Sequence, residues 1–175
     1  MALPDVFRTQ VGTVKTFKSS GGDAAITMTS VANAAARQSV KLDLGATRAR
    51  EYDVFADVEM AATPTAGNPI DLYWGPSSSA TAGTDNPGNM TGTDAAYAGY
   101  SSNLTATLPQ LQFIGSLVLT AQATATVQIG YVGRFSPAQR YGNLAVVNNG
   151  GSAIHSSATN IQFRFVPVED VVEDS

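Results

Sequence analysis

The sequence contains no cysteine, a single histidine and few charged side chains. Without cysteine, disulfide bonds, thiolate metal sites and cysteine nucleophiles are excluded. His155 alone cannot build a multi-histidine metal site within one chain, although a symmetric oligomer could bring copies together. Charged residues make up 14% of the chain, against about a quarter in ordinary domains, and no Leu, Glu and Lys heptads suggest a coiled coil. We expect no resident metal and no cofactor.

Basic runs and long apolar runs are also missing. Three Lys and seven Arg are scattered among 14 acidic residues, and the net charge of −4 disfavours a surface that follows nucleic-acid phosphates. No apolar run approaches the roughly 18 residues of a membrane helix. The start, Met-Ala-Leu-Pro-Asp-Val-Phe-Arg, has no basic region followed by an apolar stretch, so no signal peptide is predicted. We expect a protein made in the cytoplasm that binds neither nucleic acid nor membrane.

Small residues and strand-like alternation dominate what is present. The 175 residues include 26 Ala, 18 Thr, 15 Ser and 16 Gly, which is typical of short strands and turns in one domain. Alternation is clearest over 51–60 and 159–168, where apolar side chains occupy every second position. Further strands are predicted at 10–18, 23–29, 37–44, 69–75, 111–121, 124–133 and 141–148.

About eight to nine short strands with almost no helix predict an all-β fold, an antiparallel sandwich. A jelly roll fits best, because an immunoglobulin-like sandwich has only about 100 residues. One helical turn is predicted over 30–36, and Pro167 is expected to end regular strand pairing. The domain plan is an N-terminal arm at 1–9, a sandwich at 10–168 with a long loop at 75–102, and an acidic tail at 169–175.

The long polar loop at 75–102 has two interpretations. It either crosses from one sheet to the other or forms an adaptable binding surface rich in Ser, Gly, Asn and Tyr. In the second case Trp74, Tyr97 and Tyr100 face a ligand. Trp74, Tyr73 and Tyr52 could also form a sugar-stacking platform, or simply fill the core. Because Tyr73 and Trp74 are consecutive, only one of them can face the core of a regular strand.

An aromatic residue, Phe55, interrupts the acidic face of the strand over 51–60. This face carries Glu51, Asp53, Asp57 and Glu59, and it either meets a basic partner or cation or is simply solvated. Phe55 is a candidate subunit or partner contact, or it is buried beneath the long loop. Leu3, Phe7 and Arg8 in the N-terminal arm are further candidate contacts, because no local core is available to them.

Metal and catalytic sites are weak alternatives. Asp85, Asn86, Asn89 and Asp94 supply oxygen ligands of the kind calcium takes, but their spacing does not match an EF-hand loop. Carboxylates on the acidic strand have a spacing that glycoside hydrolysis could use, although nothing places them in a cleft. His155 lies beside Ser156 and Ser157, and neighbouring strand residues point to opposite faces. We therefore expect a protein that is not an enzyme.

In style, the chain resembles the small all-β virion proteins of tailed bacteriophages, especially jelly-roll capsid decoration (cement) proteins. The resemblance rests on small size, abundant Ala, Thr, Ser and Gly, the absence of cysteine, a stretch before the first strand and an acidic end. The segment Asn-Pro-Ile-Asp-Leu-Tyr-Trp-Gly-Pro-Ser at 68–77, running into the Gly/Thr/Asn loop, has the look of phage structural proteins. No diagnostic motif is present, so no residue role is carried over.

The resemblance implies a protein on the capsid exterior of the virion that binds the major capsid protein, stabilises the shell and performs no catalysis. It implies a homotrimer near three-fold positions, for which a small-molecule ligand is not expected. The alternative is a carbohydrate- or receptor-binding jelly-roll module of a phage tail or an extracellular protein.

Overall fold

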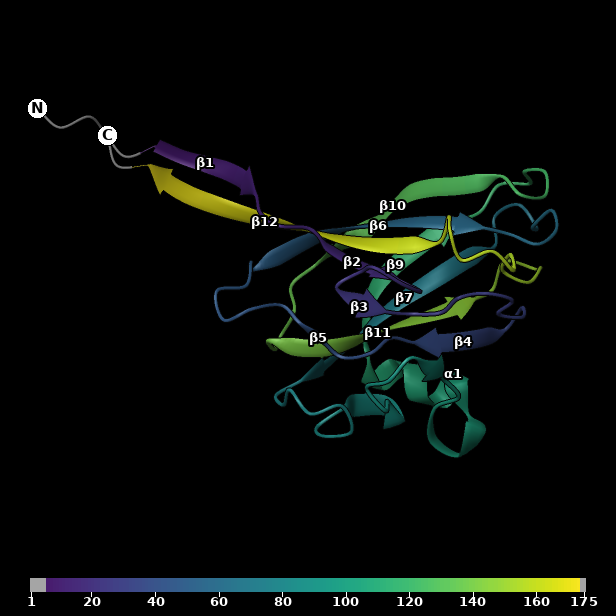
Figure 1. The fold of residues 1–175 in the computed structure, drawn as a ribbon, viewed down its shortest axis with the longest axis horizontal. Coiled ribbons are helices and arrows are strands. Elements are labelled where there is room, and N and C mark those ends of the chain that lie inside the picture. Colours follow the sequence, from purple (N-terminus) through teal and green to yellow (C-terminus); the bar gives the residue numbers. More distant parts are fainter. Residues whose placement is uncertain (1–5, 174–175) are drawn as a thin grey trace, which may run out of the picture.

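Two six-stranded β-sheets face each other in this computed structural model, which describes the backbone of residues 6–173 and the side chains of residues 12–168 (Figure 1). Sheet A has the order β10 (Val127–Phe135), β6 (Glu51–Glu59), β12 (Gln162–Glu173), β2 (Lys15–Lys18) and β3 (Ala24–Ala25), with β1 (Val6–Val11) also paired to β12. Sheet B has the order β8 (Ala95–Ala96), β4 (Ala35–Gln38), β11 (Tyr141–Asn148), β7 (Pro69–Ser77) and β9 (Gln112–Val118), with β5 (Leu42–Asp43) paired to β11.

The predicted all-β sandwich is confirmed, and apart from the parallel pair β2 and β3 the strands pair antiparallel. The structure has more strands than predicted because two expected strands are each divided in two and one short strand was not predicted. The strand expected over 10–18 is split into β1 and β2, and that over 37–44 is represented by the short strands β4 and β5. The two-residue strand β8 lies inside the long loop, where polar composition concealed it.

The core lies between the sheets and follows the alternation of the sequence. On β6, side chains from Tyr52 to Val58 at every second position are buried, as the period of two predicts. Trp74 of sheet B packs against Phe165 and Phe135, with ring centroids 5.6 and 5.9 Å apart. Phe165 is in turn 4.8 Å from Phe17. An aromatic cluster from both sheets therefore joins the two layers.

Two glycines bring the edge strands of the two sheets together. A Cβ atom at Gly115 of β9 would lie 2.2 Å from the Val132 carbonyl oxygen, and one at Gly133 of β10 would lie 2.6 Å from the Ile114 carbonyl oxygen. Only glycine allows the two main chains to approach so closely. The sandwich is thereby closed along the β9–β10 side.

Strand β1 and the outer part of β12 form a two-stranded ribbon that projects from the sandwich (Figure 1). Strand β1 pairs with β12 from Val6 opposite Glu173 to Val11 opposite Val168. The expectation that Pro167 ends regular strand pairing is therefore wrong, and where the predicted arm and acidic tail are described, at 6–9 and 169–173, they are paired with each other as strands. Pro167 is tolerated because it lies where the neighbouring chain is interrupted between β1 and β2. Leu3 lies outside the described residues.

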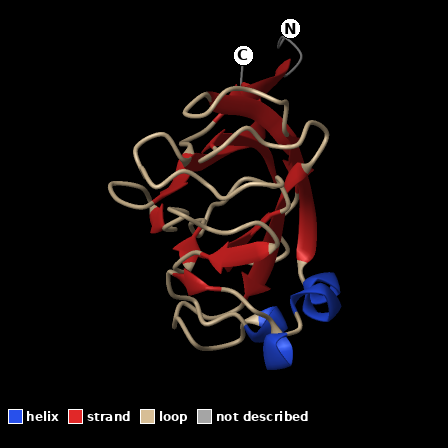
Figure 2. Cartoon of the chain, turned by 90° about the vertical axis from the view of Figure 1, so that its right-hand side faces the viewer, coloured by secondary structure: helices blue, strands red, loops and turns tan. Residues whose placement is uncertain are grey.

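The helical segments gather at the end of the sandwich opposite the chain termini (Figure 2). They are α1 (Leu104–Thr107) and the 3₁₀ turns η1 (Pro87–Asn89), η2 (Tyr100–Ser102) and η3 (Leu108–Gln110). No helix among the described residues is long and apolar enough to cross a membrane.

The helical turn predicted over 30–36 does not form. Ser30 and Ala34 have φ angles of 55° and 63°, in the left-handed region, which no right-handed helix contains. Ala36 pairs with Val147 in sheet B, and Val31 is buried in the core. Strand pairing and burial outweigh the helix propensity of alanine here, because tertiary contacts override propensity.

Candidate interaction surfaces

Strand β7 extends to Ser77, so most of the predicted loop at 75–102 belongs to a longer segment, residues 78–111, which is called the long loop from here on and packs over the outer face of sheet B. Its Met90, Tyr97 and Leu111 form a second apolar cluster with Ala145 and Val147 of β11. The Tyr97 hydroxyl donates a hydrogen bond of 2.6 Å to the Gly88 carbonyl within the loop. The loop is therefore a folded layer with its own small core.

A single lysine organises the first half of this loop. The Lys41 ammonium donates to the Ser77 hydroxyl and to the carbonyl oxygens of Ser79, Thr81 and Thr84, at 2.7–3.0 Å. Burial lowers the pKa of Lys41, and the nearby Asp85 carboxylate only partly offsets this. The ammonium fills the position that a bound cation would take among these oxygens.

A single carboxylate attaches the second half of the loop to the sheets. Asp94 accepts hydrogen bonds from the Thr27 backbone N–H and hydroxyl and from Arg37, whose Nη2 lies 2.6 Å away. Burial raises the pKa of Asp94, but the hydrogen bonds from Thr27 and Arg37 outweigh burial, so its pKa lies below the ordinary value of 3.8. The ionised carboxylate is thus the form that stabilises the fold.

Asp94→Asn should lower the free energy of unfolding at pH 7 by about 1–3 kcal/mol, because an amide cannot accept the same bonds or pair with Arg37. A lowered folded-state pKa contributes stability above 3.8, and that contribution is lost as the pH falls through the folded-state value. Urea unfolding at pH 7, 5 and 3 should therefore show the difference between variant and native protein shrinking towards pH 3. A difference that stays constant with pH would contradict this role.

The three residues predicted to face a ligand do not converge. Trp74 is fully buried in the core between the sheets, so the prediction that it faces a ligand is wrong. Tyr97 is also buried, beneath the long loop, whereas Tyr100 is about half exposed. Strand alternation directs Trp74 inwards and leaves its neighbour Tyr73 on the outer face of β7. The predicted platform of Trp74, Tyr73 and Tyr52 is likewise absent, because Tyr52 lies in the core.

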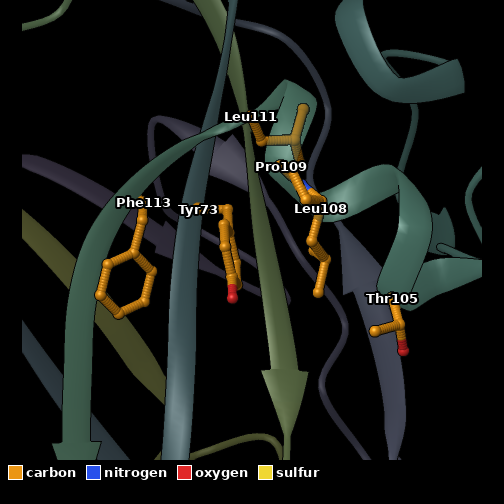
Figure 3. Close-up of a pocket in the computed structure, with 6 residues that line it drawn as sticks. All are labelled: Tyr73, Thr105, Leu108, Pro109, Leu111 and Phe113. Carbon is orange, nitrogen blue, oxygen red and sulfur yellow. The ribbon is translucent and has the colours of Figure 1, made fainter.

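An open apolar hollow lies where β7 and β9 meet the helical segments, with a volume of about 490 Å³ (Figure 3). Tyr73 stands between Phe113 and Leu108, and the Tyr73 and Phe113 ring centroids are 5.1 Å apart. Burial and the Asp71 carboxylate raise the pKa of Tyr73 above its ordinary value. Phe113 was missed from the sequence because it faces Tyr73 only through the register of β7 and β9. The other lining residues are Thr105, Pro109 and Leu111.

An exposed aromatic surface lies on the outer face of sheet A. We call it the Phe55 surface and define it by Phe55, Ile129, Tyr131 and Arg164. The rings of Phe55 and Tyr131 meet edge to face at 5.6 Å, and the Arg164 guanidinium lies 5.7 Å from the Phe55 ring centre. Ile129 and Tyr131 are 65% and 54% exposed. Phe55 thus lies on the outer face, with no part of the long loop over it, since that loop covers sheet B.

Ion pairs flank the Phe55 surface and neutralise part of the acidic strand. Arg134 donates two hydrogen bonds of 2.7 and 2.9 Å to Asp53, and these lower the pKa of Asp53. Arg164 donates a bond of 2.6 Å to Asp57, which is buried. The two arginines come from β10 and β12, so sequence alternation along β6 could not reveal them.

The remaining polar candidates make ordinary structural contacts. Glu59, at the end of the acidic strand, is buried and accepts a bond of 3.0 Å from Asn160. The backbone N–H of Ser157 donates to His155 Nδ1 at 3.1 Å, so a main-chain group, and not the serine hydroxyl, occupies that nitrogen. Asp85 accepts from Ser78, and no group of three or more acidic or histidine ligands converges among the described residues.

Comparison with known proteins supplies no relative. No family model, no curated protein and no solved structure matches the chain.

Proposed function

We propose that the sandwich is a jelly roll. Setting aside the terminal strand β1 and the two-residue strands β3, β5 and β8, eight strands remain, four in each sheet. If these eight strands are numbered along the chain, their side-by-side order in sheet A is sixth, third, eighth and first. Their order in sheet B is second, seventh, fourth and fifth. This order is the one expected of two interlocked Greek keys, the arrangement of a jelly roll. Viral capsid proteins and lectins are among the proteins built on it.

We further propose that the chain is a capsid decoration protein, which binds the exterior of a bacteriophage head and stabilises the shell. The Phe55 surface is the observation that carries this proposal. Exposed aromatic and aliphatic side chains surrounded by fixed arginine–carboxylate pairs are the composition of a protein-binding surface, with an apolar centre and a polar rim. The proposed jelly roll, an architecture found in viral capsid domains, and the phage-like composition of the sequence add support.

The mechanism is attachment without chemistry. Sheet A lies flat on the shell, Ile129 and Tyr131 enter apolar depressions of the major capsid protein, and Arg134 contributes at the rim. Arranged as trimers, many copies would each add a modest binding free energy, and together they would stabilise the shell against internal pressure. The proposal assigns the chain no catalytic step.

Ile129→Asp should weaken binding to phage heads at least tenfold. A buried charge at the centre of an apolar contact is costly, whereas in the free protein this side chain is exposed. The fold should tolerate the change, because Arg164 neutralises Asp57, the residue opposite the new carboxylate. Val118→Asp is the matched control, because Val118 is 59% exposed on the edge strand of the other sheet. Heads that lack the chain are mixed with each protein, sedimented, and then heated until they release DNA.

The native chain and Val118→Asp should sediment with the heads and raise the temperature of DNA release, and Ile129→Asp should do neither. Equal loss of binding in both variants would argue against sheet A as the attachment face. No binding by the native chain would overturn the proposed function itself.

A carbohydrate- or receptor-binding module is the second candidate, favoured by the open hollow at Tyr73 and Phe113. Aromatic rings can stack on the apolar face of a sugar. Asp71 lies on the same face of β7, and its carboxylate accepts hydrogen bonds from Ser116 and from Asn149. Binding on a glycan array that Phe113→Ser abolishes, with no binding to heads, would favour this alternative.

A further inference from the structure

The net charge of the chain lies entirely in its last seven residues. Glu169, Asp170, Glu173 and Asp174 are four of its 14 acidic residues, and no basic residue accompanies them in this segment. The remaining ten acidic residues are balanced by the ten Lys and Arg. Three of these residues, Glu169, Asp170 and Glu173, belong to the outer part of β12, which is therefore a localised negative segment on an otherwise nearly neutral chain.

This acidic part of β12 has one open strand edge. On one side β1 pairs with β12 as far as Glu173, whereas on the other side β6 pairs with it only as far as Val168, opposite Glu51. In the described part of the chain, the stretch 169–173 thus has a strand on one side only. A ribbon of two strands is marginally stable in water, and an open edge is a template for a further strand.

One hydrogen bond shows which backbone N–H and C=O groups of β12 point towards the open edge. The Pro167 carbonyl accepts a bond from the Gly12 N–H on the β1 side. Because successive residues of a strand turn their N–H and C=O groups to alternate sides, 169, 171 and 173 face β1. Asp170 and Val172 therefore direct their N–H and C=O groups to the open edge.

We infer that this edge binds an extended, lysine- or arginine-containing strand of a partner protein, which adds beside β12 in line with β6. Such a strand would supply backbone hydrogen bonds to Asp170 and Val172, and its cations would neutralise the acidic segment. A second β12 is a poor occupant, because it would place carboxylates opposite carboxylates. Only the identification of the partner as the major capsid protein rests on the proposed function. The open edge and its charge do not depend on it.

The test uses the full-length chain, labelled with ¹⁵N, and two ten-residue peptide probes. One probe alternates lysine with threonine, and the other alternates glutamate with threonine. The lysine peptide should slow hydrogen exchange at the Asp170 and Val172 amides at least tenfold and should bind more weakly as salt is added. The glutamate peptide should have neither effect. Equal binding of the two peptides would overturn the inference.

A pair of variants separates strand addition from simple charge attraction. Val172→Pro removes an N–H from the open edge and leaves the bonds of 171 and 173 to β1 in place, so the lysine peptide should bind at least tenfold more weakly. Val172→Thr keeps the N–H and should bind as the native chain does. Native-like binding by Val172→Pro would overturn strand addition.

The Asp170 and Val172 amides could also be protected from hydrogen exchange without any peptide. If that protection grew with protein concentration, a second copy of the chain would occupy the edge, and the inference would be overturned. Sedimentation of the native chain with heads is scored separately. A failed peptide result with intact head binding therefore removes the strand addition and leaves the proposed function standing.

Discussion

Replacing Trp74 by alanine is expected to lower the free energy of unfolding by about 3–5 kcal/mol. The side chain is 0% exposed and its ring lies within 6.4 Å of the ring centres of Phe17, Phe135 and Phe165. Truncation would open a cavity where the two sheets meet, and the lost contacts belong to both sheets. Urea unfolding followed by fluorescence and circular dichroism would measure the change.

Two further variants make this prediction specific. Trp74→Phe should cost clearly less than Trp74→Ala, because it keeps an aromatic ring and removes an indole N–H that has no hydrogen-bond partner in the described part of the chain. Tyr100→Ala, at a half-exposed position, should change stability by no more than about 0.5 kcal/mol. If Trp74→Ala cost as little as Tyr100→Ala, Trp74 would not belong to the core.

Replacing Lys41 by methionine should cost about 2–4 kcal/mol and release the long loop from sheet B. Methionine retains the bulk of the side chain but leaves Ser77 and three carbonyl oxygens without the ammonium that now joins them. Water can replace part of this interaction, which keeps the expected cost below that of a fully buried charge. Urea unfolding measures the stability, and limited proteolysis reports on the loop.

In Lys41→Met, cleavage within 78–111 should become much faster than elsewhere in the chain. Lys18→Met, on β2 of sheet A, is the matched control and should leave the cleavage rate of the loop unchanged. An unchanged cleavage rate in Lys41→Met would show that the apolar cluster around Met90 and Tyr97 holds the loop without the lysine.

Local pattern was sufficient for the long strands of the sandwich, of which β6 is the clearest case. Over β6 the inner and outer faces differ sharply in polarity, so alternation alone identified both the strand and its buried side. The terminal ribbon escaped prediction because it pairs residues from opposite ends of the chain. Pro167 was misleading for the same reason, since the break between β1 and β2 that accommodates it is visible only in the folded sheet.

The candidate surfaces were harder to predict, because they are formed by residues that are far apart in the sequence. Phe55 could be placed opposite the buried face of its strand, but Tyr131 and Arg164 reach it from strands far along the sequence. The sequence left open whether Tyr73 or Trp74 faces the core, because consecutive strand residues are equivalent until the sheet is packed. Lys41 and Asp94 belong to no recognisable sequence motif. Their roles arise from the path of the long loop, which brings their partners to them.

The number of copies bound per phage head at saturation tests the central claim most directly. Purified heads that lack the chain would be titrated with it, sedimented, and analysed for bound protein. The decoration proposal predicts saturable binding at a copy number set by the symmetry of the shell, in multiples of three, with a rise in the temperature of DNA release. Absence of binding, or binding that increases without saturation, would contradict it.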